Sequence, residues 1–241
     1  MLAELASPQF WFDLLQIMGI NILLSGDNAV VIALASRSLP AAQRRVAVLG
    51  GSAGAIVLRI VFCLVIVWLL HVPYLKLVGG LLLLYIGVKL VVPEGEGEGD
   101  GVAAKANVWG AIQTIIVADA VMSLDNVVAI AAAAHGSVLL ITLGLIISIP
   151  LIVFGSQLVL GVLNRFPLLV LFGGGLLGWI AGEIIVSDPA VYTHLPYDEH
   201  LQALVAKPAL ALMVVACGMF LSNRVAAQRH DVVDLAPGEQ K

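Results

Sequence analysis

Long hydrophobic runs fill most of the chain, and short polar or glycine-rich stretches separate them. A helix needs about 20 apolar residues to cross a bilayer, and seven runs come close to that length. The pattern therefore predicts an all-α membrane protein with seven transmembrane helices. We expect these helices at residues 10–36, 45–70, 74–92, 106–134, 138–160, 167–187 and 207–223.

Two of the predicted helices contain the same polar motif. Its pattern is Ser-x-Asp-Asn, and it occupies residues 25–28 of the first helix and 123–126 of the fourth, so that Asp27 and Asp125 are 98 positions apart. An ionised carboxylate inside a bilayer costs a few kcal/mol or more unless another group pairs with it. Because the chain bears this cost twice at matching positions, we interpret both carboxylates as functional.

A second match extends the repeat. Residues 73–89 resemble residues 167–183 at an offset of 94 positions. We therefore expect two copies of a three-helix unit, at 10–92 and 106–187, with the helix at 207–223 as an addition. Each copy crosses the membrane three times, so the second enters from the opposite side. Such inverted repeats are typical of transporters, in which the substrate site lies between the halves near the midplane.

The remaining segments are an acidic, glycine-rich linker at 93–105, an outer loop at 188–206 and a cytoplasmic tail at 224–241. Lys and Arg are enriched on the cytoplasmic side of membrane proteins. With the N-terminus outside, eight of these residues fall on inner segments and two on outer ones, which favours an external N-terminus and a cytoplasmic C-terminus. The inner set is Arg37, Arg44, Arg45, Lys105, Arg165, Arg224, Arg229 and Lys241, and the outer set is Lys76 and Lys207.

Composition supports the membrane assignment. Hydrophobic residues make up 61% of the chain and charged residues only 12%, too few to cover a soluble domain. The net charge of −4 gives no basic surface for nucleic acid, so the expected partner is the lipid bilayer. Cys63 and Cys217 lie in apolar helical stretches and are interpreted as small hydrophobic residues.

Polar side chains of the fourth helix share one face. At 100° per residue, Asp119, Ser123, Asp125 and Asn126 fall within a wedge of about 160°, and the first helix repeats the wedge with Asn21 in the place of Asp119. Two facing wedges would present carboxylate, amide and hydroxyl oxygens, which suit Mg²⁺, Ca²⁺ or Mn²⁺. The predicted spans contain no histidine, which argues against a dedicated zinc site.

The expected ion-binding residues are few, and simpler roles stay open for each. The amides could make only interhelical hydrogen bonds, and a carboxylate could be neutralised by a proton. Met122 projects into the same wedge; a thioether tolerates Mn²⁺ better than Mg²⁺ or Ca²⁺, although Met also simply fills space. Gly26 is expected to loosen the first helix. The predicted set is Asp27, Asn28, Asp119, Met122, Asp125 and Asn126.

Three other charged residues lie in predicted spans. Arg59 lies near the middle of the second helix and should pair with an acid, either permanently or as a counter-ion that changes partners. Lys89 and Glu183 lie near helix ends, where they serve as coupling residues or extend to the membrane surface. The predicted buried acids exceed the bases by two, which one divalent cation would balance; the acids are Asp27, Asp119, Asp125 and Glu183.

The motifs at 25–29 and 123–127, with the run Ala181 to Pro189, resemble the TerC family of integral membrane proteins, in particular its shorter, YjbE-like branch. The resemblance covers residues 10–225. It implies that the protein exports metal ions, chiefly manganese, across the bacterial inner membrane. It also implies membership of the wider group of LysE-like exporters. It also implies that the Asp and Asn residues of the motifs, with Asp119, handle the ion.

Two alternatives belong to other classes. A LysE-like exporter of amino acids would need a cation for the substrate carboxylate, and Arg59 is the candidate at depth. An intramembrane aspartyl protease is suggested by Gly26-Asp27, but Leu24 replaces the first glycine of the Gly-x-Gly-Asp motif. We therefore expect neither catalysis nor a cofactor. The sequence leaves transport direction, coupling ion and any oligomeric state open.

Overall fold

The computed structural model describes residues 7–24, 26–69, 72–92, 101–135, 137–166, 168–194 and 199–234, and all its regular elements there are helices. The prediction of an all-α chain is confirmed for these residues. The helices are α2 (Pro8–Leu24), α3 (Gly26–Ser36), α4 (Ala41–Leu69), α5 (Leu75–Val91), α6 (Gly101–Ala133), α7 (Val138–Arg165), α8 (Leu168–Val186), α9 (Pro189–Tyr192) and α10 (Glu199–Asp234).

Five of these helices are long and apolar enough to cross a membrane, namely α4, α6, α7, α8 and α10. A sixth candidate is the pair α2 and α3, which are bent by 52° at a short break. With 17 residues, α5 reaches about 25 Å at 1.5 Å per residue, less than the hydrocarbon core of about 30 Å. The chain is thus a multi-pass membrane protein with five or six clear spans, and a seventh span stays a prediction.

The break in the first span lies where Gly26 was expected to loosen it. The 52° bend separates α2 from α3, which begins at Gly26, so this prediction is confirmed. Glycine is a poor helix former because its backbone loses more conformational freedom on folding than that of any other residue. The matching segment of α6 contains Leu124 instead and stays helical throughout.

Several helices extend beyond the predicted spans. α10 covers residues 199–234 where residues 207–223 were expected, and α6 begins at Gly101, inside the predicted linker. Apolar run length detects only the part of a helix that suits lipid, whereas the hydrogen-bonded helix continues into polar sequence. Part of the predicted linker (93–100), part of the outer loop (195–198) and the end of the tail (235–241) lie outside the described residues.

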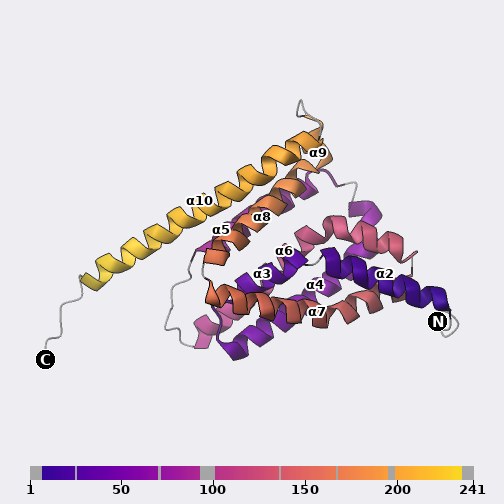
Figure 1. The fold of residues 1–241 in the computed structure, drawn as a ribbon, viewed down its shortest axis with the longest axis horizontal. Helices are drawn as coiled ribbons and strands as arrows, with labels where there is room; N and C mark the ends of the chain where they lie inside the picture. Colours follow the sequence, from indigo (N-terminus) through magenta and orange to yellow (C-terminus); the bar gives the residue numbers. More distant parts are fainter. Residues whose placement is uncertain are drawn as a thin grey trace.

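The helices form two groups (Figure 1). α8 packs against both α5 and α10 in one group, and α2, α3, α4, α6 and α7 form the other. Glycine permits the close contact of α8 with α10, since a Cβ atom added at Gly178 would lie 2.5 Å from the carbonyl oxygen of Leu210. An apolar cluster that includes Val31 of α3, Leu83 of α5 and Leu177 of α8 joins the groups.

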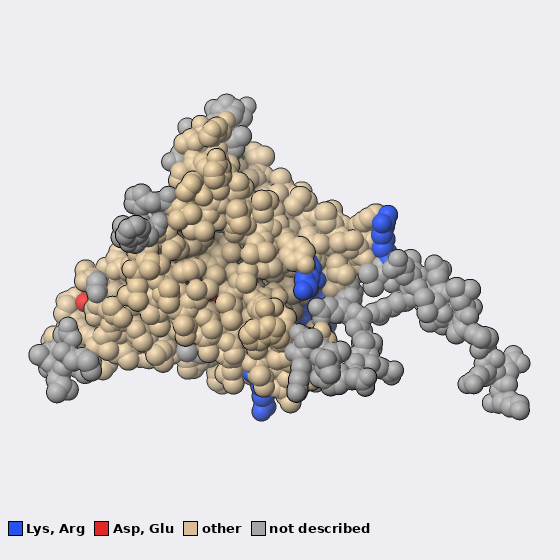
Figure 2. Space-filling model, turned by 180° about the vertical axis from the view of Figure 1, so that it is seen from behind, with Lys and Arg blue, Asp and Glu red and all other residues tan. Residues whose placement is uncertain are grey.

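The outer surface suits contact with lipid. On the face shown in Figure 2, uncharged residues cover nearly the whole surface, and the visible Lys and Arg side chains lie in separate patches, beside the end of α10, right of centre and at the lower edge. Large apolar side chains point outward, such as Phe154, Leu158 and Phe172, which are 76%, 72% and 72% exposed. Such exposure would be unfavourable in water over so large an area but is favourable in hydrocarbon.

Candidate functional site

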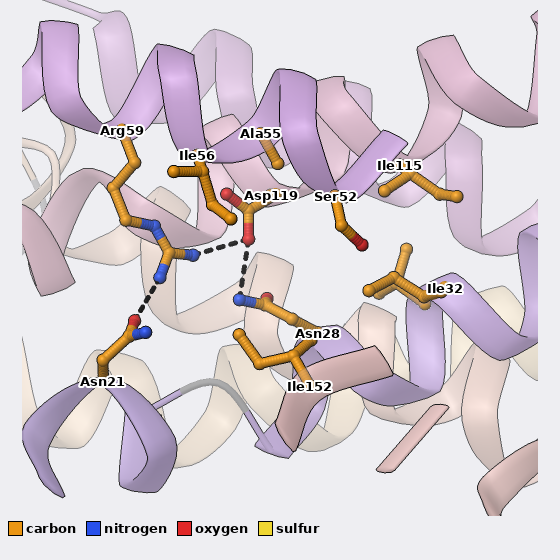
Figure 3. Close-up of a pocket in the computed structure, with 11 residues that line it drawn as sticks. Asn21, Asn28, Ile32, Ser52, Ala55, Ile56, Arg59, Ile115, Asp119 and Ile152 are labelled. Atoms are coloured by element: carbon orange, nitrogen blue, oxygen red, sulfur yellow. Dashed lines mark hydrogen bonds and ion pairs between the residues drawn. The ribbon is translucent and has the colours of Figure 1, made fainter. Parts of the chain in front are cut away.

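The centre of the candidate site is an ion pair between α4 and α6. Arg59 Nη2 donates to Asp119 Oδ1 at 2.5 Å, and Arg59 is only 3% exposed. The same guanidinium donates through Nη1 to Asn21 Oδ1 of α2 (Figure 3). The expectation that Arg59 pairs with an acid is confirmed. Each charge lowers the cost of burying the other, and the neutral amide of Asn21 satisfies a further donor.

Asp119 accepts two further side-chain hydrogen bonds. Asn28 Nδ2 of α3 donates to Asp119 Oδ1 at 2.8 Å, and Ser123 Oγ, one turn along α6, donates to Oδ2 at 3.1 Å. Both oxygens of the carboxylate are therefore engaged. The side chain connects α3, α4 and α6 at one point in the membrane-spanning region.

Two motif residues satisfy backbone groups at the break between α2 and α3. Asp27 Oδ1 accepts the backbone N–H of Asn28 at 2.8 Å, in the first turn of α3, where a negative charge interacts favourably with the helix dipole. Asn126 Nδ2 of α6 donates to the carbonyl oxygen of Leu24 at 3.2 Å. A break inside a membrane requires such partners, because no water is available to the freed groups.

A small cavity lies beside the ion pair. Its volume of about 20 Å³ leaves room for about one water molecule or an ion of similar size. Figure 3 shows the residues around it, which come from α2, α3, α4, α6 and α7. Its polar lining is Asn21, Asn28, Ser52, Arg59 and Asp119, and its apolar lining is Val31, Ile32, Ala55, Ile56, Ile115 and Ile152.

The other predicted site residues lie away from the cavity or outside the residues that the structure describes. Met122 is 5% exposed and belongs to the apolar cluster that joins the two helix groups, not to the cavity lining. Glu183 is 56% exposed and forms an ion pair with Lys207 Nζ at 2.8 Å. Lys89 is exposed on α5. The side chain of Asp125, and Ser25 as a whole, lie outside the described residues.

The predicted meeting of several acids is not seen among the residues that the structure describes. No group of three His, Cys, Asp or Glu side chains there could hold a metal ion. Asp27 does not line the cavity, so Asp119 is the carboxylate that the described residues contribute to its lining. Amide and hydroxyl oxygens make up the rest of the acceptors at this place.

Sequence reasoning missed three polar residues of the interior. Ser52 lies seven residues, or about two turns, before Arg59 on the same face of α4, and this spacing is a signal that could have found it. Asp13 is 6% exposed and accepts a hydrogen bond from Gln9 Nε2 at 2.7 Å. Asp188, expected in a loop, is 1% exposed and accepts the backbone N–H groups of Leu77 and Ala190.

These features define the class of the protein. It is a polytopic helical membrane protein with a buried polar site beside a broken helix. The chain belongs to the integral membrane protein TerC family, whose pattern matches residues 6–230.

Relatives of this chain include membrane proteins from two bacteria. It is 39% identical over 207 residues to the "Uncharacterized membrane protein YjbE" of Bacillus subtilis, with 86% of this chain and 94% of the relative covered. It is 26% identical over 181 residues to the "UPF0053 inner membrane protein YgdQ" of Escherichia coli, with 68% and 76% covered. No solved structure matches the chain.

Proposed function

We propose that this protein exports a divalent metal ion, with Mn²⁺ as the preferred substrate, across the bacterial inner membrane. The observation that carries the proposal is a carboxylate of low exposure, Asp119 (12% exposed), held by a buried arginine beside a break in a membrane-spanning helix. Broken helices in transporters leave polar groups available to an ion near the midplane. The proposal needs neither catalysis nor a resident cofactor.

Oxygen chemistry supports a hard or borderline dication as substrate. The cavity lining offers the Asp119 carboxylate with amide and hydroxyl oxygens, and its described part contains neither Cys nor His. Mg²⁺, Ca²⁺ and Mn²⁺ prefer such oxygen ligands. We assign Asp27, Asp125 and Asn126 to the same ion path, as residues that receive the ion when the helices rearrange.

Arg59 acts in this proposal as a tethered cation that occupies the site when no metal is bound. Leaving either member of a buried ion pair unpaired costs about 3–5 kcal/mol. An arriving dication neutralises Asp119 and frees Arg59, which already donates to Asn21. After the ion leaves, the guanidinium returns to the carboxylate. The charge of the site is thus compensated before and after transport.

Two reciprocal contacts support an inverted repeat. A Cβ atom added at Gly51 of α4 would lie 2.9 Å from Ile115 of α6, and one added at Gly144 of α7 would lie 2.5 Å from Ile17 of α2. Ile17 and Ile115 are 98 positions apart, the same offset as the two Asp-Asn motifs. α4 thus packs on α6 as α7 packs on α2. We propose that the two halves rock against each other to open the site to either side.

The proposed orientation has the N-terminus outside and the C-terminus in the cytoplasm. It is supported by the excess of Lys and Arg on the segments that would then face the cytoplasm, eight against two. The relative YgdQ is named as an inner membrane protein, which is consistent with a location in the inner membrane.

Purified protein in liposomes tests this function. We expect Mn²⁺ flux, followed with a metal-sensitive dye, that responds to an imposed pH gradient at fixed membrane potential. Protons enter as metal leaves, because Arg59 compensates only one negative charge, and further carboxylates of the ion path, such as Asp27, take up protons that metal binding displaces. If the Mn²⁺ flux does not change with the imposed pH gradient, transport is not coupled to protons and the protein is a uniporter. Transport of a labelled amino acid without any divalent ion would replace the proposal with the alternative exporter.

A further inference from the structure

Two oxygen atoms that line the central cavity have no hydrogen-bond partner among the described residues. They are Ser52 Oγ of α4 and Asn28 Oδ1 of α3, on residues that are only 5% and 3% exposed. Buried polar atoms are nearly always satisfied in folded proteins, so each exception calls for an explanation. Both atoms here belong to the lining of one cavity, which suggests a common ligand.

Ser52 differs from other buried serines of the same protein. Ser36 Oγ donates to the carbonyl oxygen of Ile32, and Ser148 Oγ donates to that of Gly144, each at 2.7 Å and each four residues earlier in its helix. This is the usual bond of a serine inside a helix. The hydroxyl of Ser52 does not make it and instead extends toward the space between α4 and α3 (Figure 3).

The chemistry of the three acceptors fits a dication. Asp119 supplies one negative charge, and the amide oxygen of Asn28 and the hydroxyl of Ser52 supply neutral oxygens from two other helices. The affinity of an oxygen site depends on how many of its ligands are charged. One carboxylate with neutral oxygens therefore gives a site that binds a dication and also releases it, as a transporter requires.

We infer that Ser52 is a ligand of the transported metal ion, together with Asn28 and Asp119. The inference rests on the proposed function, because it names a further residue of the same site. A single bridging water is the other occupant that a polar cavity of this size can hold. The two occupants differ in what they predict for metal affinity when Ser52 is changed.

The first measurement is Mn²⁺ binding to purified protein, followed by the loss of the magnetic resonance signal of free Mn²⁺. Ser52→Ala should weaken binding about tenfold, because it removes one ligand of a charged ion. It should leave the thermal unfolding temperature close to that of the wild type, since the hydroxyl makes no hydrogen bond with the described residues. Unchanged Mn²⁺ affinity would overturn the inference and favour the water.

The second measurement exchanges the ligand atom. Ser52→Cys should raise the affinity for Cd²⁺ relative to Mn²⁺ by tenfold or more, because thiolates favour soft ions. Ser148→Cys is the matched control, since Ser148 is also buried in a helix but lies outside the cavity lining. Cys63 and Cys217 are present in both variants, so their contribution cancels in the comparison.

The outcomes separate the inference from the function on which it rests. A wild-type protein that binds neither Mn²⁺, Mg²⁺ nor Ca²⁺ overturns both. A wild type that binds Mn²⁺, together with equal Cd²⁺/Mn²⁺ ratios in Ser52→Cys and Ser148→Cys, overturns the role of Ser52 alone.

Discussion

The two copies of the Ser-x-Asp-Asn motif fold differently although their polar residues are the same. In the first copy the helix breaks at Gly26, and Asp27 binds the backbone of its own new helix. In the second copy α6 continues through Leu124, and Asn126 reaches across to the broken helix. One residue that differs between the copies, Gly26 against Leu124, accompanies the difference in backbone.

The difference continues five residues earlier along each helix. Asn21 and Asp119 occupy equivalent positions, and Arg59 donates to both. Among the residues that the structure describes, the cavity lining therefore holds one carboxylate for its one arginine, where two identical copies would have two or none. Sequence repeats thus fix where the side chains lie, while single substitutions between copies decide which side chain carries the charge.

The largest effect is expected from removing that charge. Asp119→Asn should lower the free energy of unfolding by about 3–5 kcal/mol, because Arg59 would remain buried without its anion, and it should abolish Mn²⁺ transport. Denaturant unfolding in detergent and liposome flux measure the two effects. Asp13→Asn, which changes a buried carboxylate outside the cavity lining, should cost only about 1–3 kcal/mol and keep transport.

A double variant tests the equivalence of the two positions directly. Asn21→Asp combined with Asp119→Asn moves the carboxylate from one copy to the other while Arg59 stays within reach of it. We expect it to recover most of the stability that Asp119→Asn loses. A double variant no more stable than the single one would show that the two copies are not interchangeable.

Next in size are the motif carboxylates. Asp27→Asn and Asp125→Asn should each abolish metal transport while the protein still inserts and folds. Asparagine keeps one oxygen acceptor, so at position 27 the bond to the Asn28 amide can persist, but it lacks the charge that offsets the lost hydration of a dication. Flux and gel-filtration profiles test both variants. If both variants transport metal at the wild-type rate, the carboxylates of the two motifs have a structural role and do not handle the ion.

A smaller effect is expected from making the first copy more like the second. Gly26→Ala should raise the free energy of unfolding by up to about 1 kcal/mol, through higher helix propensity, and slow transport severalfold by straightening the break. No described residue lies within 4 Å of a Cβ atom added there or at Gly19, so Gly19→Ala is the matched control. If both variants transport at the wild-type rate, the bend has no part in the mechanism.

The smallest effect is expected at Met122. Its side chain is buried in an apolar cluster, so Met122→Leu should lower the free energy of unfolding by less than about 1.5 kcal/mol. It should leave the ratio of Mn²⁺ to Ca²⁺ affinity unchanged. Competition binding on the purified variant measures that ratio. A narrower preference for Mn²⁺ would identify the thioether as a ligand.

The sequence predicts much of this arrangement, since hydrophobic length, the motif offset and helix propensity are local properties. They place the spans and the break at Gly26, and the cost of a buried charge predicts a partner for Arg59. They do not show which acid that partner is. Asp119, rather than Asp27, meets Arg59 because α4 packs on α6 through Gly51 and Gly54, a contact between distant parts of the chain.

The role of Asp27 at the break and the orientation of Ser52 are harder to predict for the same reason. In the sequence, a carboxylate on a polar helix face gives the same pattern whether it binds a backbone amide or lines a cavity. A serine inside a predicted helix is expected to donate a hydrogen bond to the backbone of its own helix, as Ser36 and Ser148 do. Only packing between helices decides these alternatives.

The shortness of α5 has a consequence for the surrounding lipid. Its 17 residues span about 25 Å, and its neighbour α8, with 19 residues, spans about 28 Å. Tyr85 and Val78 of α5 are 64% and 61% exposed, so this side would face lipid tails if α5 is the predicted seventh span. A bilayer of ordinary thickness would then thin beside these helices, at a cost that grows with each ångström of mismatch. Acyl-chain length in the host membrane should therefore tune the activity of this protein.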